Sequence, residues 1–76
     1  MKFYGINATA HQTGITESTL RRWESMGFFT ADRVFLGDYE MRMYSDQLVD
    51  LLRRVKNVID DGLRLRAAFE FLDEGE

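Results

Sequence analysis

Four glycines, at positions 14, 27, 37 and 62, divide this chain into segments with different hydrophobic periods. Glycine readily adopts the left-handed backbone conformation in which helices end and tight turns form. Apolar residues recur three or four positions apart before Gly27 and after Ser45, as in amphipathic helices, whereas the stretch around Gly37 is rich in β-forming residues. The pattern predicts a mainly α fold of four short helices with a small β-hairpin.

The first two predicted helices are separated by a short turn at Gly14. The first is expected from Asn7 to Gln12, with the Asn7 side chain as its N-cap. Thr16 is expected to cap the second, and Glu17 lies in its first turn, where the helix dipole favours a negative charge. Two helices joined by a short glycine-containing turn are typical of a helix-turn-helix.

A change of period follows the second helix, which is expected to end at Gly27 in a left-handed conformation. From Arg33 to Tyr44 the sequence is β-rich on both sides of Gly37 and Asp38. A two-residue turn that begins with glycine favours a hairpin. The sequence therefore predicts a two-stranded wing behind the helix-turn-helix.

Two further helices are predicted after the wing. Ser45 followed by Asp46 is a helix start, Gly62 is the expected stop, and a last helix should run from Arg64 to Leu72. Apolar residues at steps of three and four give these helices, like the second one, an inward side. The residues expected to face the core from the last three helices are Leu20, Trp23, Leu48, Leu51, Leu52, Val55, Val58, Ile59, Leu65, Ala68, Phe69 and Leu72.

The size and composition of the chain exclude several classes of function. With 76 residues it has room for a single core, so residues 1–76 are expected to be one domain. It has no cysteine and one histidine, which excludes disulfides, zinc fingers, thiolate catalysis and histidine-rich metal sites, and no cofactor is expected. No nucleophile and base occur in a catalytic pattern and no glycine loop is suited to phosphate, so we expect no enzymatic activity.

The net charge of −3 predicts weak overall attraction to a polyanion. Four of the 13 acidic residues lie in the last seven positions, however, so residues 1–69 carry all ten basic residues against nine acidic ones. The first residues lack the features of a signal peptide, and no window is apolar enough for a membrane span. We therefore expect a cytoplasmic protein without a membrane partner.

One set of residues occurs at a spacing typical of a single family. It comprises Tyr4, Ile6, Ala10, Gly14, Ile15, Thr19, Leu20, Arg21, Trp23, Glu24, Gly27, Phe28, Phe29, Arg33, Arg42, Tyr44, Ser45, Leu48, Leu51 and Leu52. In this combination, residues 4–63 resemble the DNA-binding domain of the mercury-resistance regulator (MerR) family. The wing departs from the family pattern, because it is longer and has Glu40 and Met41 before Arg42. Residues 64–72 are expected to be an extra C-terminal helix and residues 73–76 an acidic tail.

The resemblance implies a winged helix-turn-helix that binds double-stranded DNA, with the second helix in the major groove and the wing on the flanking backbone. The first residues of a recognition helix face the base edges, which makes Thr16, Glu17 and Ser18 candidates for sequence reading. Candidate contacts to the DNA backbone come from the rest of this helix, whose arginines Arg21 and Arg22 would meet phosphate or reach guanine, and from the wing. They are Arg21, Arg22, Trp23, Tyr39, Arg42 and Tyr44.

Three functions remain open at this point. A transcription regulator would bind inverted half-sites as a dimer, whereas a phage or plasmid excisionase would bind direct repeats and bend the DNA. A protein-interaction module that has kept the winged fold is an alternative of another class. Self-association or cooperative binding through Phe69 and Phe71 would fit either role on DNA. No site for a small-molecule effector is evident.

Overall fold

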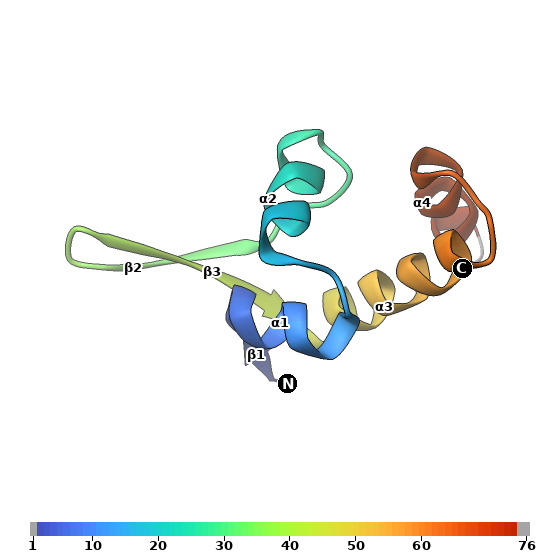
Figure 1. The fold of residues 1–76 in the computed structure, drawn as a ribbon. Helices are drawn as coiled ribbons and strands as arrows, with labels where there is room; N and C mark the ends of the chain where they lie inside the picture. Colours follow the sequence, from blue (N-terminus) through green and yellow to red (C-terminus); the bar gives the residue numbers. More distant parts are fainter. Residues whose placement is uncertain (1, 75–76) are drawn as a thin grey trace.

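The computed structural model describes residues 2–74, which form four helices and a small antiparallel sheet (Figure 1). The wing and the last helix lie at opposite ends of the molecule, with the second helix between them (Figure 1). The predicted fold class, a mainly α winged helix-turn-helix, is confirmed. In chain order the elements are β1 (Phe3–Tyr4), α1 (Ile6–Thr13), α2 (Glu17–Ser25), β2 (Asp32–Leu36), β3 (Tyr39–Ser45), α3 (Asp46–Asp60) and α4 (Leu65–Glu74).

The predicted starts of α2 and α3 are confirmed in their capping groups. The Thr16 hydroxyl accepts a hydrogen bond from the Thr19 backbone N–H at 3.2 Å. The Ser45 hydroxyl accepts one from the Leu48 backbone N–H at 3.1 Å. Each bond satisfies a backbone donor that the first turn of a helix leaves without an intrahelical partner.

The prediction that the Asn7 side chain caps the first helix is wrong. α1 begins at Ile6, and its N-cap is Gly5, which has no side chain to bond the first turn. Asn7 lies inside the helix, where its side-chain amide donates to the Glu17 carboxylate at 3.2 Å. Asn7 therefore ties the first helix to the start of the second instead of capping its own helix.

The predicted helix ends at Gly27 and Gly62 are confirmed. Gly27 has a φ of +89°, and beyond it the Phe28 N–H donates to the Trp23 carbonyl at 3.1 Å. Gly27 itself donates to the Glu24 carbonyl at 3.0 Å, which completes a Schellman motif. The same pair of backbone bonds ends α3 at Gly62, whose φ is +113°. Both glycines thus allow the chain to turn sharply out of a helix while the last carbonyls stay bonded.

The core lies between α2, α3 and the last helix, and Phe69 of α4 joins them. Its ring meets Trp23 edge-on with centroids 5.7 Å apart and stacks on Phe28 at 4.9 Å. Leu52 of α3 is fully buried in the same core. Phe69 is buried, so of the two residues predicted to take part in self-association only Phe71, 62% exposed, lies at the surface, and its part there stays a prediction.

The sheet contains one strand more than the predicted hairpin. β2 and β3 pair from Asp32↔Met43 to Leu36↔Tyr39 around a two-residue turn, as expected. β1, only two residues long, pairs with the end of β3, so the strand order is β1-β3-β2. The hairpin therefore projects from a base that the N-terminal residues hold against the body (Figure 1).

Two glycine substitutions should change stability in opposite directions. A Cβ added to either Gly27 or Gly5 would meet no atom within 4 Å, so packing does not decide the outcome. Gly27→Ala should destabilise the fold by about 1–2 kcal/mol, because an L-residue is strained at positive φ. Gly5→Ser should stabilise it by about 0.5 kcal/mol, because its φ of −73° and ψ of 173° suit an N-cap serine. Urea unfolding followed by circular dichroism measures the stability of both variants. A Gly27→Ala variant as stable as the wild type would contradict the assignment of Gly27 as the left-handed end of α2.

Candidate nucleic-acid interface

The N-terminal half of α2 is exposed, as a recognition helix requires. Thr16 and Ser18 are exposed and Glu17 is partly exposed. The Thr16 hydroxyl, which caps the helix, also donates to the Thr19 hydroxyl at 2.8 Å and lies 3.3 Å from the Ser18 hydroxyl. Thr16 is therefore committed to the helix start, and Ser18 is the hydroxyl better placed for an external partner.

The two arginines of α2 differ in their surroundings. Arg21 forms an ion pair with Glu17 at 3.4 Å, and both side chains are well exposed. Glu17 is also held by the Asn7 amide. Arg22 is exposed and forms no ion pair with any residue between positions 2 and 72. Arg22 thus presents its full charge to solvent, whereas an acidic neighbour partly compensates that of Arg21.

Two of the predicted contact residues lie in the core. Trp23 is 6% exposed and packs against Phe69, and Tyr44 has no exposed surface at all. Burial raises the pKa of the Tyr44 phenol, and the nearby Glu24 carboxylate raises it further. Tyr44 therefore has no exposed surface with which to contact DNA, whereas the contact expected from Trp23, whose ring packs inward, stays a prediction for its indole N–H.

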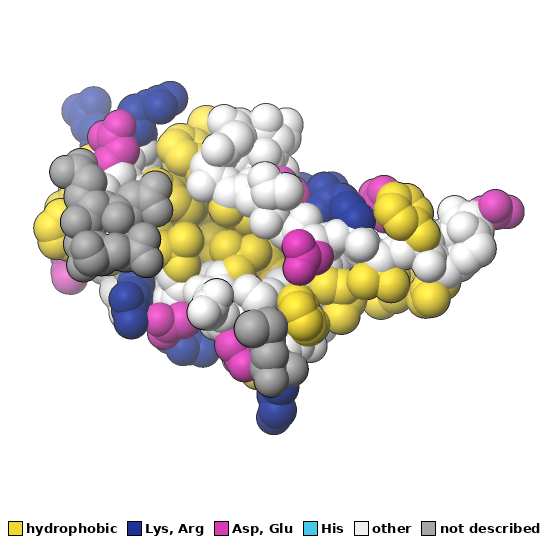
Figure 2. Space-filling model, turned by 180° about the vertical axis from the view of Figure 1, so that it is seen from behind, with side chains coloured by type: hydrophobic (Ala, Val, Ile, Leu, Met, Phe, Trp, Pro, Cys, Tyr) yellow, Lys and Arg dark blue, Asp and Glu magenta, His cyan; other side chains and the backbone are white. Residues whose placement is uncertain are grey.

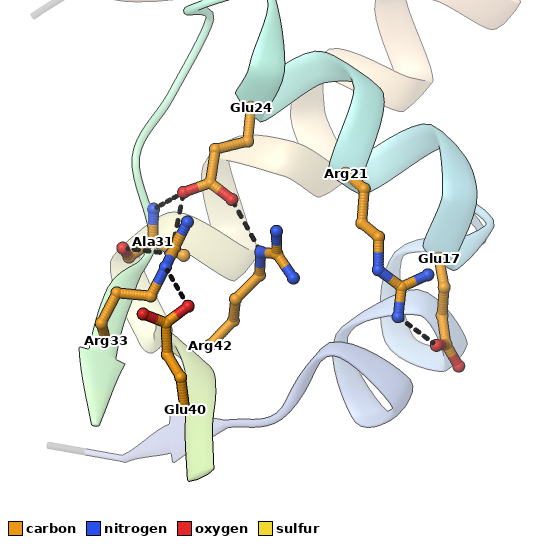
Figure 3. A network of polar contacts seen from close by, with 7 residues as sticks. All are labelled: Glu17, Arg21, Glu24, Ala31, Arg33, Glu40 and Arg42. Carbon is orange, nitrogen blue, oxygen red and sulfur yellow. Dashed lines mark hydrogen bonds and ion pairs between the residues drawn. The ribbon is translucent and has the colours of Figure 1, made fainter. Parts of the chain in front are cut away.

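A carboxylate between α2 and the wing holds the two elements together (Figure 3). One oxygen of Glu24 accepts the Ala31 backbone N–H at 2.9 Å and pairs with Arg33 Nη1 at 3.0 Å. The other oxygen accepts Arg42 Nε at 3.0 Å. We call this set of contacts the Glu24 clamp. It joins the C-terminal half of the recognition helix to both strands of the wing and to the loop that connects α2 with β2.

The charged form of Glu24 is favoured although its side chain is buried. The Glu24 side chain is only 9% exposed, and burial alone raises its pKa. The hydrogen bonds from Arg33, from the Ala31 N–H and from Arg42 outweigh burial, so the pKa of Glu24 lies below its ordinary value. Arg33 is held in turn by the Ala31 carbonyl at 2.9 Å and by Glu40 at 3.5 Å. The carboxylate is therefore charged at neutral pH and binds both arginines.

The wing residues predicted to contact DNA lie on different faces of the hairpin. Arg42 is partly exposed and uses only its Nε on Glu24, and Figure 3 shows its terminal nitrogens pointing into the space between the wing and Arg21. Tyr39 pairs with Leu36 across the hairpin and is 64% exposed. Since successive residues of a strand face opposite ways, Tyr39 lies on the face opposite to Glu40 and Arg42. The structure thus brings Arg42 near the recognition helix and leaves Tyr39 on the other side.

Glu24 and Arg33 are the residues whose role the sequence does not reveal. Glu24 lies three positions after Arg21, so a surface ion pair along α2 is the natural prediction for it. Its partners are instead nine and eighteen positions away, on the two wing strands. The only sign of a shared acidic partner in the sequence is that each of the two wing strands contains an arginine.

None of the helices in the described part of the chain has the length and apolar run that a membrane crossing requires. Within the same residues, no three histidine or acidic side chains gather as metal ligands would. The family model described as MerR HTH family regulatory protein matches residues 4–75. No curated protein matches the chain.

Glu24→Gln should destabilise the protein in a pH-dependent way. Because the pKa of Glu24 is lowered in the folded state, its charge stabilises the fold above the ordinary value of 4.5, and this stabilisation disappears as the pH falls through the folded-state pKa. Relative to the wild type, the variant should lose about 1–3 kcal/mol of unfolding free energy at pH 7. The difference should shrink below about pH 4.5.

Urea unfolding of both proteins between neutral and acid pH measures this difference. Glu17→Gln is the matched control, since it removes a carboxylate of the same helix from an exposed pair and should cost at most about 0.5 kcal/mol. A Glu24→Gln deficit that stays constant with pH would show that the carboxylate charge does not hold the clamp.

Proposed function

The chain belongs to the MerR helix-turn-helix family of regulatory proteins, and from this premise we propose that it recognises a specific sequence in double-stranded DNA as a transcription regulator. The family consists of DNA-binding regulators, which supports a role without catalysis. Action on DNA fits a cytoplasmic location. The observation that carries the proposal is an exposed recognition helix joined by the Glu24 clamp to a wing that presents Arg42 on the side of this helix.

Sequence reading is assigned to the start of α2. Ser18, Thr16 and Glu17 lie in its first turn or cap it, on the exposed side of the helix. In a helix-turn-helix this end of the recognition helix faces the base edges of the major groove. The carboxylate of Glu17 can accept from the amino group of cytosine, which makes this turn suited to reading bases as well as to positioning.

Contact with the DNA backbone is assigned to three arginines. Arg22 is unpaired among the described residues, and Arg21 can exchange its exposed pair with Glu17 for a phosphate at little cost. Arg42 keeps its Nε on Glu24 while its terminal nitrogens stay available on the same side as Arg21. Tyr44 supports this surface from below, and the ring of Trp23 packs beneath it. Phosphate contacts of this kind set affinity and register rather than sequence preference.

The proposal is tested by selecting bound duplexes from a random pool, with the wild type and an Arg21→Ala, Arg22→Ala double variant side by side. The wild type should enrich one motif, and the double variant should lose it. Each lost phosphate contact should lower the slope of log affinity against log salt by about 1. Arg53→Ala is the control, since Arg53 is an exposed arginine on α3 that pairs with Asp50.

The arrangement of the selected motif distinguishes the roles on DNA. Inverted half-sites about ten base pairs apart, or a multiple of this, support a dimeric regulator. Direct repeats in DNA that becomes bent would instead indicate an excisionase. A wild type that enriches no motif at low salt would overturn DNA recognition and leave a protein partner as the ligand of this surface.

A further inference from the structure

The Glu17 carboxylate accepts one hydrogen bond on each of its two oxygens. The side-chain amide of Asn7, in the first turn of α1, donates to Glu17 Oε2 at 3.2 Å. Arg21, one turn further along α2, donates to Glu17 Oε1 at 3.4 Å (Figure 3). Asn7 is exposed and Glu17 is partly exposed, so both border the surface that the start of α2 presents. The first residue of the recognition helix is thus held from a second helix.

The position of Asn7 relative to Glu17 is fixed by a buried turn between α1 and α2. The Thr13 side chain is buried, and its hydroxyl donates to the Thr9 carbonyl at 2.8 Å. The same hydroxyl accepts the Ile15 backbone N–H at 3.2 Å, and Ile15 is itself part of the core. A turn that is bonded on both sides and packed into the core holds the two helices in one arrangement. The bond from Asn7 to Glu17 therefore joins two parts of one rigid unit.

The two partners of Glu17 should respond differently to DNA. Arg21 belongs to an exposed ion pair, which contributes little in water, and a phosphate can accept two hydrogen bonds from its guanidinium at once. Asn7 is uncharged and is not drawn to a phosphate in this way. When Arg21 moves to a phosphate, Glu17 Oε1 is left as an acceptor without a partner. The carboxylate itself stays in place, because Asn7 still holds Oε2.

A carboxylate in this position can distinguish the four bases in the major groove. Cytosine presents only a donor there, its amino group, whereas guanine and thymine present acceptors and adenine presents an acceptor beside its amino group. A carboxylate accepts hydrogen bonds and donates none, so the acceptors of the other bases repel it. The helix dipole favours a negative charge in the first turn of α2, which lowers the cost of bringing Glu17 to a polyanion.

The far side of the wing has a different character. Figure 2, which views the molecule from behind, shows hydrophobic side chains in a row along the projecting wing. The register of the hairpin places Val34, Leu36 and Met41 on the side away from Arg33 and Arg42. Hydrophobic side chains form no hydrogen bond with a base edge. This side of the wing therefore does not compete with the first turn of α2 in the hydrogen-bonded reading of bases.

On the premise of the proposed function, we infer that Glu17 selects cytosine at one position of the DNA motif and that Asn7 is the positioning residue for its carboxylate. Glu17 Oε2 keeps its bond to the Asn7 amide. Glu17 Oε1 accepts from the cytosine amino group once Arg21 has moved to a phosphate. The first helix thus takes part in sequence reading without touching a base.

Selection of bound duplexes from a random pool, read as base frequencies at each position of the motif, tests the role of Glu17. The wild type should favour cytosine at one position by at least about fivefold over each other base. Glu17→Gln should lose this preference. The Asn7 amide retains the one remaining oxygen, so the new amide nitrogen, a donor, faces the donor of cytosine.

The role of Asn7 is tested in the same selection. Asn7→Ala should reduce the preference for cytosine to about twofold or less, because the carboxylate is no longer held, and should leave the other positions of the motif unchanged. Asn57→Ala is the control, since it removes the same side chain from an exposed place on α3 and should select like the wild type. Circular dichroism confirms that each variant is folded.

A double variant separates positioning from a general structural role. In a Glu17→Ala background there is no carboxylate to hold, so the addition of Asn7→Ala should leave the base preference unchanged. A residue that only stabilised the fold would lower the affinity for all sequences by the same factor, in either background.

Three results would overturn the inference while DNA recognition stands. They are a motif in which no position responds to Glu17→Gln, an Asn7→Ala variant that keeps the full preference for cytosine, and one that weakens binding to all sequences equally. A wild type that enriches no motif would overturn the proposed function and this inference with it. The two kinds of failure are distinguishable, because only the first leaves a selected motif.

Discussion

The recognition surface of this protein depends on one carboxylate, that of Glu24. Outside the clamp, the loop around Ala31 is the covalent link between α2 and the wing, and a loop alone sets no fixed angle. By accepting from the loop backbone and from an arginine of each strand, Glu24 adds to the pairing of β1 with β3 a direct tie between the recognition helix and the hairpin, which is in place before any ligand binds. A preorganised surface does not lose this conformational freedom on binding, which is the usual cost of ordering a flexible wing.

The Glu24 clamp gives the two arginines of the wing different roles. Arg33 uses its Nη1 on Glu24 and on the Ala31 carbonyl and its Nε on Glu40, so these contacts all lie within the protein. Arg42 donates to Glu24 through its Nε, and its terminal nitrogens lie on the side of the recognition helix. Arg33, Arg42 and Glu40 lie on the face of the hairpin that meets α2, and the alternation of a β-strand places Val34, Leu36 and Met41 on the opposite face. The difference between the two faces thus follows from the register of the hairpin.

Most of the fold could be predicted from the sequence because its signals are local. Thr16 and Ser45 cap helices through bonds that span three residues, and Gly27 and Gly62 end them through backbone bonds of similar reach. The two-residue strand β1 could not be found, because it has no periodicity of its own and exists only through its pairing with β3. Asn7 was misplaced for a related reason, since its amide bonds a different helix.

For the site, the sequence determined which residues are present and which of them share a helix or a hairpin. Thr16, Ser18, Arg21 and Arg22 lie on the exposed part of α2 because helical periodicity puts Leu20 and Trp23 on the buried side. Tertiary structure decided whether a residue of this set reaches the surface and with what charge. Tyr44 is buried and Glu24 is bound to the wing because elements distant in sequence pack over them, and burial and ion pairing depend on distances in space that no local pattern encodes.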